Sequence, residues 1–227
     1  MTIRQTRRED RFASAPRAIH FDAAFRARLR DLLLWRRDVR RFRPDPLPPG
    51  TLENLIELAC LAPSVGLSQP WRFVIVEDDA RRAAVRENFA AANAQALCAQ
   101  APQRAGLYAR LKLAGLGEAP VHFAVFADRA TTQGHGLGRR TMPQTIDYSA
   151  VTAVHTIWLA ARAQGVGLGW VSILDPPAIA TILDVPTTWK LIGYFCLGYP
   201  HAGDTIPELE RAGWEERNPT AAMIIRR

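Results

Sequence analysis

The sequence predicts a single α/β domain, and three observations support this fold class. The chain has 227 residues, enough to bury one sizeable hydrophobic core. Apolar runs of strand length alternate with segments whose apolar residues recur at helical spacing, an order typical of a parallel sheet covered by helices. No internal repeat or linker divides the chain. We therefore expect one domain over residues 21–227, preceded by a mobile basic arm at 1–20.

The domain is expected to begin with a helix and a proline-rich connection. Apolar residues recur at helical spacing from Phe21 to Leu33, and Asp22 is a favourable N-cap, so a helix should end near the stretch WRRDVR at 35–40. The stretch RPDPLPPG at 43–50 should be extended, because a proline disfavours helix at the residue before it.

The later elements follow from the length and periodicity of the apolar runs. In chain order we expect a helix at 52–59, a strand at 72–78, a helix at 79–100, a strand at 122–128, a helix at 148–165, a strand at 167–174, a short helix at 177–183 and a strand at 190–200. The helix at 148–165 is apolar on most faces, so it should be buried against a sheet or in an oligomer interface. Residues 129–145 carry glycines and a proline without periodicity, as in a functional or disordered loop.

Composition narrows the class of protein. The net charge is +7, but five of the arginines lie in residues 1–17, without a recognition helix, zinc knuckle or aromatic RNA-binding motif, so nucleic-acid binding is not expected. No apolar run approaches the length of a membrane span, so no membrane association is expected. Cys60, Cys98 and Cys196 are widely spaced in apolar contexts, as are reduced core cysteines in a cytoplasmic protein.

Several common site motifs are absent. The stretch GVGLGW at 165–170 has Trp170 where a dinucleotide-binding loop needs its third glycine, and it precedes a strand instead of opening a helix. There is no P-loop and no nucleophile elbow. The histidines lack metal-ligand spacing, so no metal is expected, and His122 and His155 should be satisfied groups in or near the core.

The stretch RRDVR carries the first candidate site residues. Arg36 and Arg40 lie four apart, so they can present two guanidiniums on one face at a helix end. Guanidinium forks suit phosphate because they donate in a fixed planar pair. The alternative is a solvated helix end in which Asp38 pairs within the helix.

Two further segments carry polar candidates. Ser64, Ser68 and Gln69 lie in the loop PSVGLSQP, whose amides and small side chains can grip the polar edge of a heteroaromatic ring. The alternative is a simple helix-to-strand turn. Ser172 lies at or near a strand end, where a lone serine is more often structural.

Taken together and in order, five stretches carry a resemblance to a known family: WRRDVRRFRPDP, APSVGLSQPWRFV, GLGRRTMPQTIDYS, GVGLGWVSILDP and PELERAGWEER. The chain resembles the nitroreductase superfamily of FMN-binding proteins from about residue 21 to 218. Within it, the chain looks like the BluB family of 5,6-dimethylbenzimidazole synthases. Ordinary nitroreductases commonly have Ser in place of Asp38 and Asn in place of Leu67, and both replacements favour the narrower family.

The resemblance implies a different sheet from the one that alternation suggests. It implies an α+β, nitroreductase-like fold with a mixed, mainly antiparallel sheet flanked by helices, in an intertwined homodimer with two FMN sites at the interface. It also implies that reduced FMN is the substrate, supplied by a separate NAD(P)H-dependent flavin reductase. Fragmentation with O2 would yield 5,6-dimethylbenzimidazole, the lower ligand of cobalamin, and erythrose 4-phosphate. Carbon 2 of the benzimidazole would come from the first ribityl carbon.

The resemblance also implies roles for individual residues. Asp38 is expected to be a catalytic base whose pKa the surrounding arginines lower, and Ser172 is expected to orient a reaction intermediate. Residues 131–145 and 108–116 are candidate lids. The residues expected to bind FMN are Arg36, Arg37, Asp38, Val39, Arg40, Ser64, Leu67, Ser68, Gln69, Trp170, Ser172 and Arg217. The alternatives are an NAD(P)H-dependent nitroreductase or flavin reductase, and a flavin-binding protein without catalysis.

Overall fold

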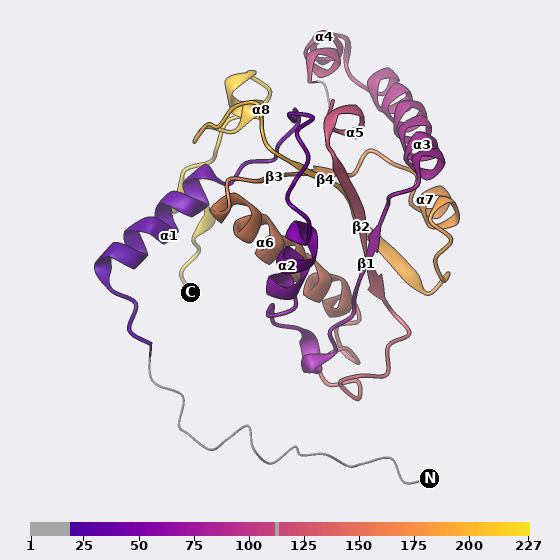
Figure 1. Ribbon diagram of the computed structural model, residues 1–227. Coiled ribbons are helices and arrows are strands. Elements are labelled where there is room, and N and C mark those ends of the chain that lie inside the picture. Colours follow the sequence, from indigo (N-terminus) through magenta and orange to yellow (C-terminus); the bar gives the residue numbers. More distant parts are fainter. Residues whose placement is uncertain (1–18, 112–113) are drawn as a thin grey trace.

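The structure is a computed structural model that describes residues 19–111 and 114–227 (Figure 1). Almost all of the expected N-terminal arm at 1–20 lies outside these residues, and the arm stays a prediction. None of the helices in the described ranges combines the length and the apolar character needed to cross a bilayer.

A four-stranded sheet forms the centre of the molecule. The strands are β1 (Trp71–Ile75), β2 (Val121–Asp128), β3 (Gly167–Val171) and β4 (Trp189–Gly198), in the order β1-β2-β4-β3. All three neighbouring pairs are antiparallel. The parallel sheet suggested by alternation is therefore wrong, and the mainly antiparallel sheet implied by the resemblance is confirmed.

Alternation misleads here because a helical connection does not fix the direction of the next strand. Three helices separate β1 from β2, namely α3 (Asp79–Cys98), α4 (Pro102–Arg110) and α5 (Gly115–Glu118), yet the two strands are antiparallel neighbours. Within the described ranges, the parallel pairing is a single bridge between Asp38 and Leu168, at the edge strand β3.

Helices cover both faces of this sheet (Figure 1). One face carries α6 (Thr145–Ala163) and α2 (Thr51–Ala59), and the other carries α3 and α7 (Pro176–Ile182). The helix α6 begins at Thr145 instead of residue 148, and its burial against the sheet is confirmed. Its buried residues are Ile146, Asp147, Ser149, Ala150, Ala153, Val154, Ile157 and Ala161.

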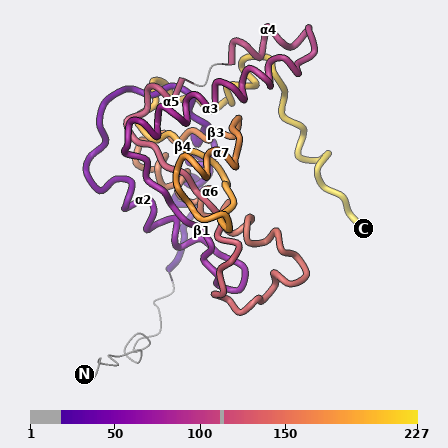
Figure 2. Tube along the Cα trace, turned by 90° about the vertical axis from the view of Figure 1, so that its right-hand side faces the viewer, coloured from indigo at the N-terminus to yellow at the C-terminus, as the bar shows by residue number. Residues whose placement is uncertain are grey.

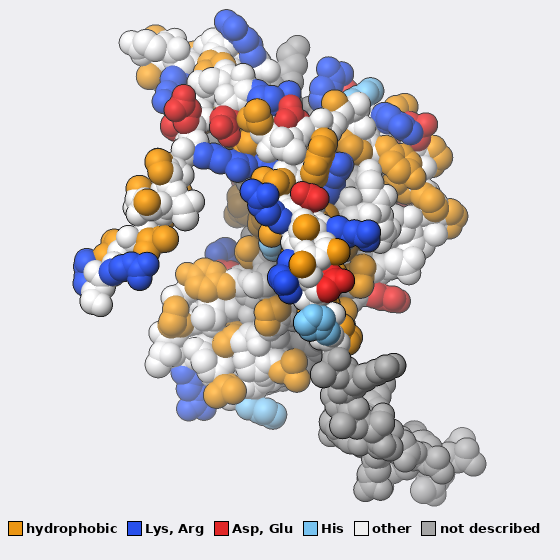
Figure 3. Space-filling model, turned by 90° about the vertical axis from the view of Figure 1, so that its left-hand side faces the viewer, with side chains coloured by type: hydrophobic (Ala, Val, Ile, Leu, Met, Phe, Trp, Pro, Cys, Tyr) orange, Lys and Arg blue, Asp and Glu red, His pale blue; other side chains and the backbone are white. Residues whose placement is uncertain are grey.

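The first helix, α1 (Ala23–Trp35), begins where the sequence predicts and ends at the start of the expected stretch 35–40. Arg36 and Arg40 therefore follow the helix, and the expectation that they share one of its faces is wrong. The Asp22 side chain caps it by accepting a hydrogen bond from the Phe25 amide at 2.7 Å. Its apolar face is not covered by the rest of the described chain, since Phe25, Leu29 and Leu33 keep 45%, 41% and 45% of their surface exposed. Apolar and basic side chains lie together on the face of the molecule that carries α1 (Figure 3).

The C-terminal segment leaves the body of the molecule. After the short helix α8 (Glu208–Arg211), the chain runs outward through a 3-10 turn, η3 (Thr220–Met223), to its end (Figure 2). Neither of these elements was predicted, nor were α4 and α5. They are too short, or too poor in buried apolar residues, to give a periodic signal.

Two expectations about single side chains are wrong. Cys98 is exposed at the end of α3, whereas Cys60 is half-buried and Cys196 is buried. His155 is exposed on the outer side of α6, because the sheet side of this helix is taken by small and aliphatic residues. An apolar neighbourhood in the sequence therefore did not fix which side of a helix these residues occupy.

His122 is buried, as expected. Its Nδ1 lies 3.0 Å from the Tyr194 hydroxyl and its Nε2 lies 3.1 Å from the Ala119 carbonyl oxygen. Burial lowers the pKa of His122 to about 4, so the ring is neutral and both nitrogens are satisfied.

Candidate functional site

The arginine segment, residues 36–40, follows the C-terminus of α1 and pairs alongside the edge strand β3. The Val39 amide donates to the Leu168 carbonyl at 3.0 Å, as one strand does to another. The contact is close enough to require glycine on β3, because a Cβ at Gly169 would lie 2.2 Å from the Val39 carbonyl oxygen. The segment is therefore fixed by its backbone, which holds its side chains in defined positions.

Asp38 is held by the same edge strand. Its Oδ1 accepts a hydrogen bond from the Trp170 amide at 2.8 Å, and its Oδ2 lies 3.8 Å from Nε of Arg40. The side chain keeps 35% of its surface exposed, so a reactant can reach the carboxylate. The carboxylate therefore pairs with the sheet and with a neighbouring arginine, and not within a helix.

The pKa of Asp38 differs from the expectation. Burial raises it above the usual value for an aspartate, and this effect outweighs the Trp170 hydrogen bond and the cations of Arg40 and Arg36, which lower it. The prediction that arginines would lower the pKa is wrong in its net direction. A raised pKa makes the ionised carboxylate a stronger base, which suits a catalytic role better.

Arg36 and Arg40 present guanidiniums that lack hydrogen-bond partners among the described residues. Arg36 stacks over the Trp158 ring, 4.7 Å from its centroid, and burial lowers the pKa of Arg36. The Arg40 side chain is only 13% exposed, and its contacts with carboxylates are longer than hydrogen bonds. Poorly hydrated guanidiniums with unused donors are suited to a bound anion.

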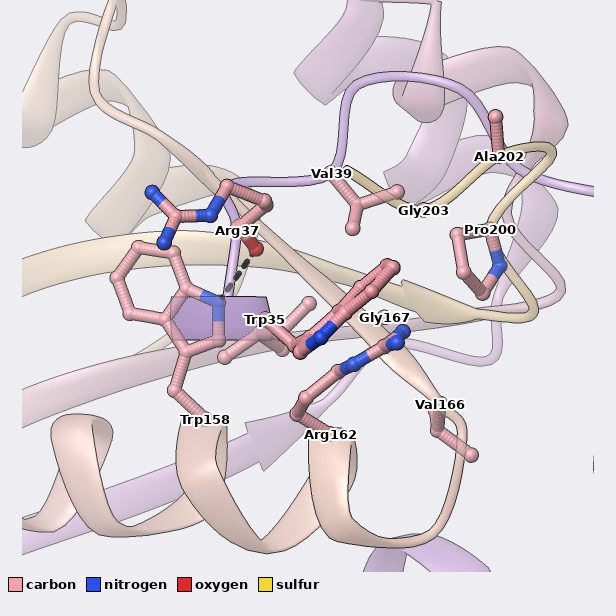
Figure 4. Close-up of a pocket in the computed structure, with 11 residues that line it drawn as sticks. Trp35, Arg37, Val39, Trp158, Arg162, Val166, Gly167, Pro200, Ala202 and Gly203 are labelled. Carbon is pink, nitrogen blue, oxygen red and sulfur yellow. Dashed lines mark hydrogen bonds between the residues drawn. The ribbon is translucent and has the colours of Figure 1, made fainter. Parts of the chain in front are cut away.

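Arg37 and Arg217 differ from these two. The Arg37 guanidinium turns back and donates to the Leu34 carbonyl at the end of α1, while its own carbonyl accepts from Trp158 Nε1 at 3.0 Å (Figure 4). Arg37 therefore contributes through its backbone, which helps to fix the arginine segment. Arg217 is exposed, 3.6 Å from Glu210, and close enough to Arg36 to lower its pKa.

The second group of predicted residues lies in the loop at 64–69, which contains the 3-10 turn η2 (Val65–Leu67). Ser64 Oγ accepts from the Gln69 amide at 3.1 Å. Leu67 and Gln69 both have positive φ, 56° and 41°, a conformation that costs free energy for these residue types. Ser68 is buried and its hydroxyl has no partner within the described part of the chain.

The loop at 129–144 packs on this second group. Gln133 Nε2 donates to the Leu67 carbonyl at 2.8 Å and lies 3.3 Å from Gln69 Oε1. A Cβ at Gly134 would lie 2.5 Å from the Gly66 carbonyl oxygen, so the two backbones touch. Gln133 was not predicted, because nothing in a sequence shows which loops meet.

A buried carboxylate anchors the ends of that loop to the sheet. Asp147, on the first turn of α6, accepts hydrogen bonds from Arg129 at 2.6 Å and from Lys190 at 2.8 Å. Burial alone would raise the pKa of Asp147, but these two hydrogen bonds outweigh it and hold the pKa below its usual value. This ion cluster was also missed by the sequence.

The helix α6 separates the two groups of predicted residues. Ser149 accepts a hydrogen bond from the Val65 amide near its beginning, and Trp158 supports Arg36 near its end. These two residues are about 14 Å apart along the helix axis. One copy of the chain thus places the arginine segment and the loop at 64–69 at opposite ends of α6.

Ser172 lies just beyond the strand with which the arginine segment pairs. It is exposed and directly follows β3, two residues after Trp170, whose amide binds Asp38. Glu208, on α8, also lies here, 3.9 Å from Arg40, although no pattern in the sequence singled it out. No cluster of His, Cys, Asp and Glu capable of holding a metal ion occurs among residues 19–111 and 114–227.

The donors at the two ends fit FMN. The unused guanidinium donors of Arg36 and Arg40 suit a phosphate group. The buried, unpartnered Ser68 hydroxyl suits a polar ring edge, since a buried hydroxyl without a hydrogen bond is unfavourable.

Comparison with known sequences identifies close relatives. The nitroreductase family matches residues 33–199. A 5,6-dimethylbenzimidazole synthase of Rhodospirillum rubrum is 55% identical to this chain, over 88% of this chain and 94% of the relative. One from Rhodobacter capsulatus is 46% identical, over 89% of this chain and 98% of the relative.

Comparison with solved structures supports the fold. The crystal structure of oxidized iodotyrosine deiodinase, bound to FMN and 3-iodo-L-tyrosine, aligns with a TM-score of 0.68 at 24% identity. The alignment covers 88% of this chain and 97% of that one.

Proposed function

The chain belongs to the nitroreductase family, and from this premise we propose that it is a 5,6-dimethylbenzimidazole synthase. It would convert reduced FMN and O2 to 5,6-dimethylbenzimidazole and erythrose 4-phosphate. One observation carries the proposal beyond family membership. A carboxylate with a raised pKa, Asp38, lies between two arginines whose donors are unused. That arrangement suits proton removal next to a bound phosphate ester.

Binding would begin at the phosphate. Arg36 and Arg40 would donate to it, and Arg217, which lies close to Arg36, would add a third cation. Charge-assisted hydrogen bonds from a planar fork are strong and directional. The backbone of Arg37 and Val39 fixes the arginines, because it is paired with Trp158 and with β3.

Asp38 would act as the base. When bound, reduced FMN supplies electrons for O2 and the carbon skeleton of the product. Breaking its ribityl chain requires removal of a proton from a hydroxyl or from the carbon that bears it. Asp38 Oδ2 is available for this step, because Oδ1 is already held by the Trp170 amide. Ser172, at the end of the same strand, would orient the reacting oxygen.

The loop at 64–69 would position the ring, through Ser64, Leu67, Ser68 and Gln69. The loop at 131–145 rests on it through Gln133 and Gly134 and would exclude water. Residues 108–116 are the second proposed lid, although Lys112 and Leu113 lie outside the described residues.

We further propose that the active form is a homodimer. The uncovered apolar face of α1 and the exposed Met223, Ile224 and Ile225 of the extended C-terminal segment offer surface for a second copy. Removing such apolar surface from water is favourable by about 25 cal/mol per Å², which must exceed the entropic cost of association. The loop at 64–69 of one copy would then complete the site formed by the arginine segment of the other. Sedimentation of the flavin complex as a monomer would contradict this arrangement.

The partner supplying reduced FMN would be a separate NAD(P)H-dependent flavin reductase, in the cytoplasm. Anaerobic mixing of the FMN-loaded protein with NADPH tests this assignment. We expect slow bleaching of the flavin absorbance, with tight binding of FMN that has been reduced chemically. Rapid bleaching by NADPH alone would instead identify an ordinary nitroreductase or flavin reductase.

A further inference from the structure

Arg40 lies between two carboxylates from distant parts of the chain. Its Nε is 3.8 Å from Asp38 Oδ2 and 3.9 Å from Glu208 Oε2. Asp38 belongs to the arginine segment, and Glu208 is the first residue of α8. Neither distance is that of a hydrogen bond, so the guanidinium lies near both acids without being hydrogen-bonded to either.

We propose that Glu208 is a positioning residue for the reaction, which competes with the Asp38 carboxylate for the Arg40 guanidinium. The inference rests on the function proposed above, in which Asp38 removes a proton. It assigns a catalytic effect to a residue that is not expected to touch the substrate.

Burial is the main cause that raises the pKa of Asp38. The negative charge of Glu208 acts in the same direction as burial and against the Trp170 hydrogen bond and the cations of Arg40 and Arg36. A base is most effective when its pKa approaches the working pH, so this acid supports the reaction from a distance. Glu208 keeps 39% of its side chain exposed, and solvent and salt will therefore weaken the coupling.

Other charged and polar groups face Asp38, but they do not duplicate this role. Besides Arg40 and Glu208, Arg36 and the Trp170 amide act on the pKa of Asp38, and Asp38 in turn raises the pKa of the Cys196 thiol on β4. The cleft beside Asp38 is also lined by Arg37, Arg41, His201, Asp204 and Arg211. Asp204 pairs with Arg211 at 3.2 Å, whereas Glu208 shares a cation with Asp38.

The test is a carboxyl titration in the full-length protein without flavin. The protein is labelled with ¹³C at the aspartate carboxyl groups, and the Asp38 signal is assigned by its loss in Asp38→Asn. We expect the Asp38 midpoint to move to lower pH in Glu208→Gln and to stay near the wild-type value in Glu208→Asp. Glu216→Gln is the matched control, because it removes one exposed negative charge from the same C-terminal segment. An unchanged midpoint in Glu208→Gln, or an equal movement in Glu216→Gln, would overturn the inference.

The pH dependence of product formation gives the second readout. In Glu208→Gln the acid limb of the rate profile should move to lower pH, at saturating reduced FMN. A uniform loss of rate without movement of this limb would indicate a merely structural role and would overturn the inference. If the wild-type protein forms no 5,6-dimethylbenzimidazole, the proposed function fails, while the titration still decides whether Glu208 controls Asp38.

Discussion

Replacing Asp38 by Asn tests the proposed base with the least disturbance of the site. The variant keeps the size of the side chain and an oxygen that can accept from the Trp170 amide, but it has no carboxylate. We expect FMN binding to persist, because Arg36, Arg40 and Arg217 are unchanged. Product formation should fall by about 10²–10⁴-fold, the usual contribution of a positioned general base.

Asp38→Asn should also change the thermal stability of the protein, and the direction of this change follows from the raised pKa of Asp38. Because the pKa of Asp38 is raised in the folded protein, the folded state holds a proton there more tightly than the unfolded state does. This stabilising contribution is present below the unfolded pKa and is lost as the pH rises through the folded pKa. At neutral pH the ionised carboxylate therefore destabilises the fold. We expect Asp38→Asn to have a higher Tm than the wild type at pH 7, without flavin, and a smaller advantage in acid.

Two assays check this prediction. Mass spectrometry measures 5,6-dimethylbenzimidazole after the reduced complex is exposed to air, and scanning calorimetry measures Tm across the pH range. Asp31→Asn, an exposed aspartate on α1, is the control for loss of a carboxylate. Undiminished product from Asp38→Asn would remove this residue from the mechanism. A Tm below that of the wild type at pH 7 would refute the argument that burial dominates its energetics.

Three further changes have expected outcomes. Arg40→Ala should weaken FMN binding by about 1.5–3 kcal/mol, the usual contribution of hydrogen bonds to a charged group. A fluorescence titration measures this affinity, and an unaltered value would place the phosphate elsewhere. Gly134→Ala should lower Tm and product yield more than the control Gly136→Ala. Both glycines have positive φ, but only a Cβ at Gly134 would clash with the Gly66 carbonyl oxygen. Equal effects of the two substitutions would contradict this contact. Asp147→Asn should destabilise the fold by about 1–3 kcal/mol at pH 7. Because its pKa is depressed, that difference should shrink as the pH falls through the folded pKa, and a constant difference would argue against the ion cluster.

The elements with periodic apolar patterns were predictable from the sequence. The α1 cap at Asp22, the buried strands and the α6 helix lie close to their expected positions, because burial and capping are local or periodic requirements. Strand direction was not predictable from alternation, since it depends on where a long connection returns. The antiparallel direction of the strands was instead implied by the resemblance to the nitroreductase superfamily.

The roles of the candidate site residues stay predictions, and their electrostatics could not be predicted from the sequence. The density of arginines indicated an anion site, and the structure holds Arg36 and Arg40 with unused donors, although not on a helix. The sequence could not show that Asp38 would lie half-buried against β3, so the predicted direction of its pKa shift was wrong. Gln133 and Glu208 were missed because each acts through a contact between distant segments.

The central claim is that the protein breaks reduced FMN apart to make 5,6-dimethylbenzimidazole. The fate of the first ribityl carbon tests this claim most directly. The protein is loaded with reduced FMN carrying ¹³C at the first ribityl carbon and is then exposed to air. We predict 5,6-dimethylbenzimidazole that is one mass unit heavier than the unlabelled product, with a matching loss of flavin. Quantitative recovery of intact labelled FMN, with no benzimidazole formed, would contradict the account.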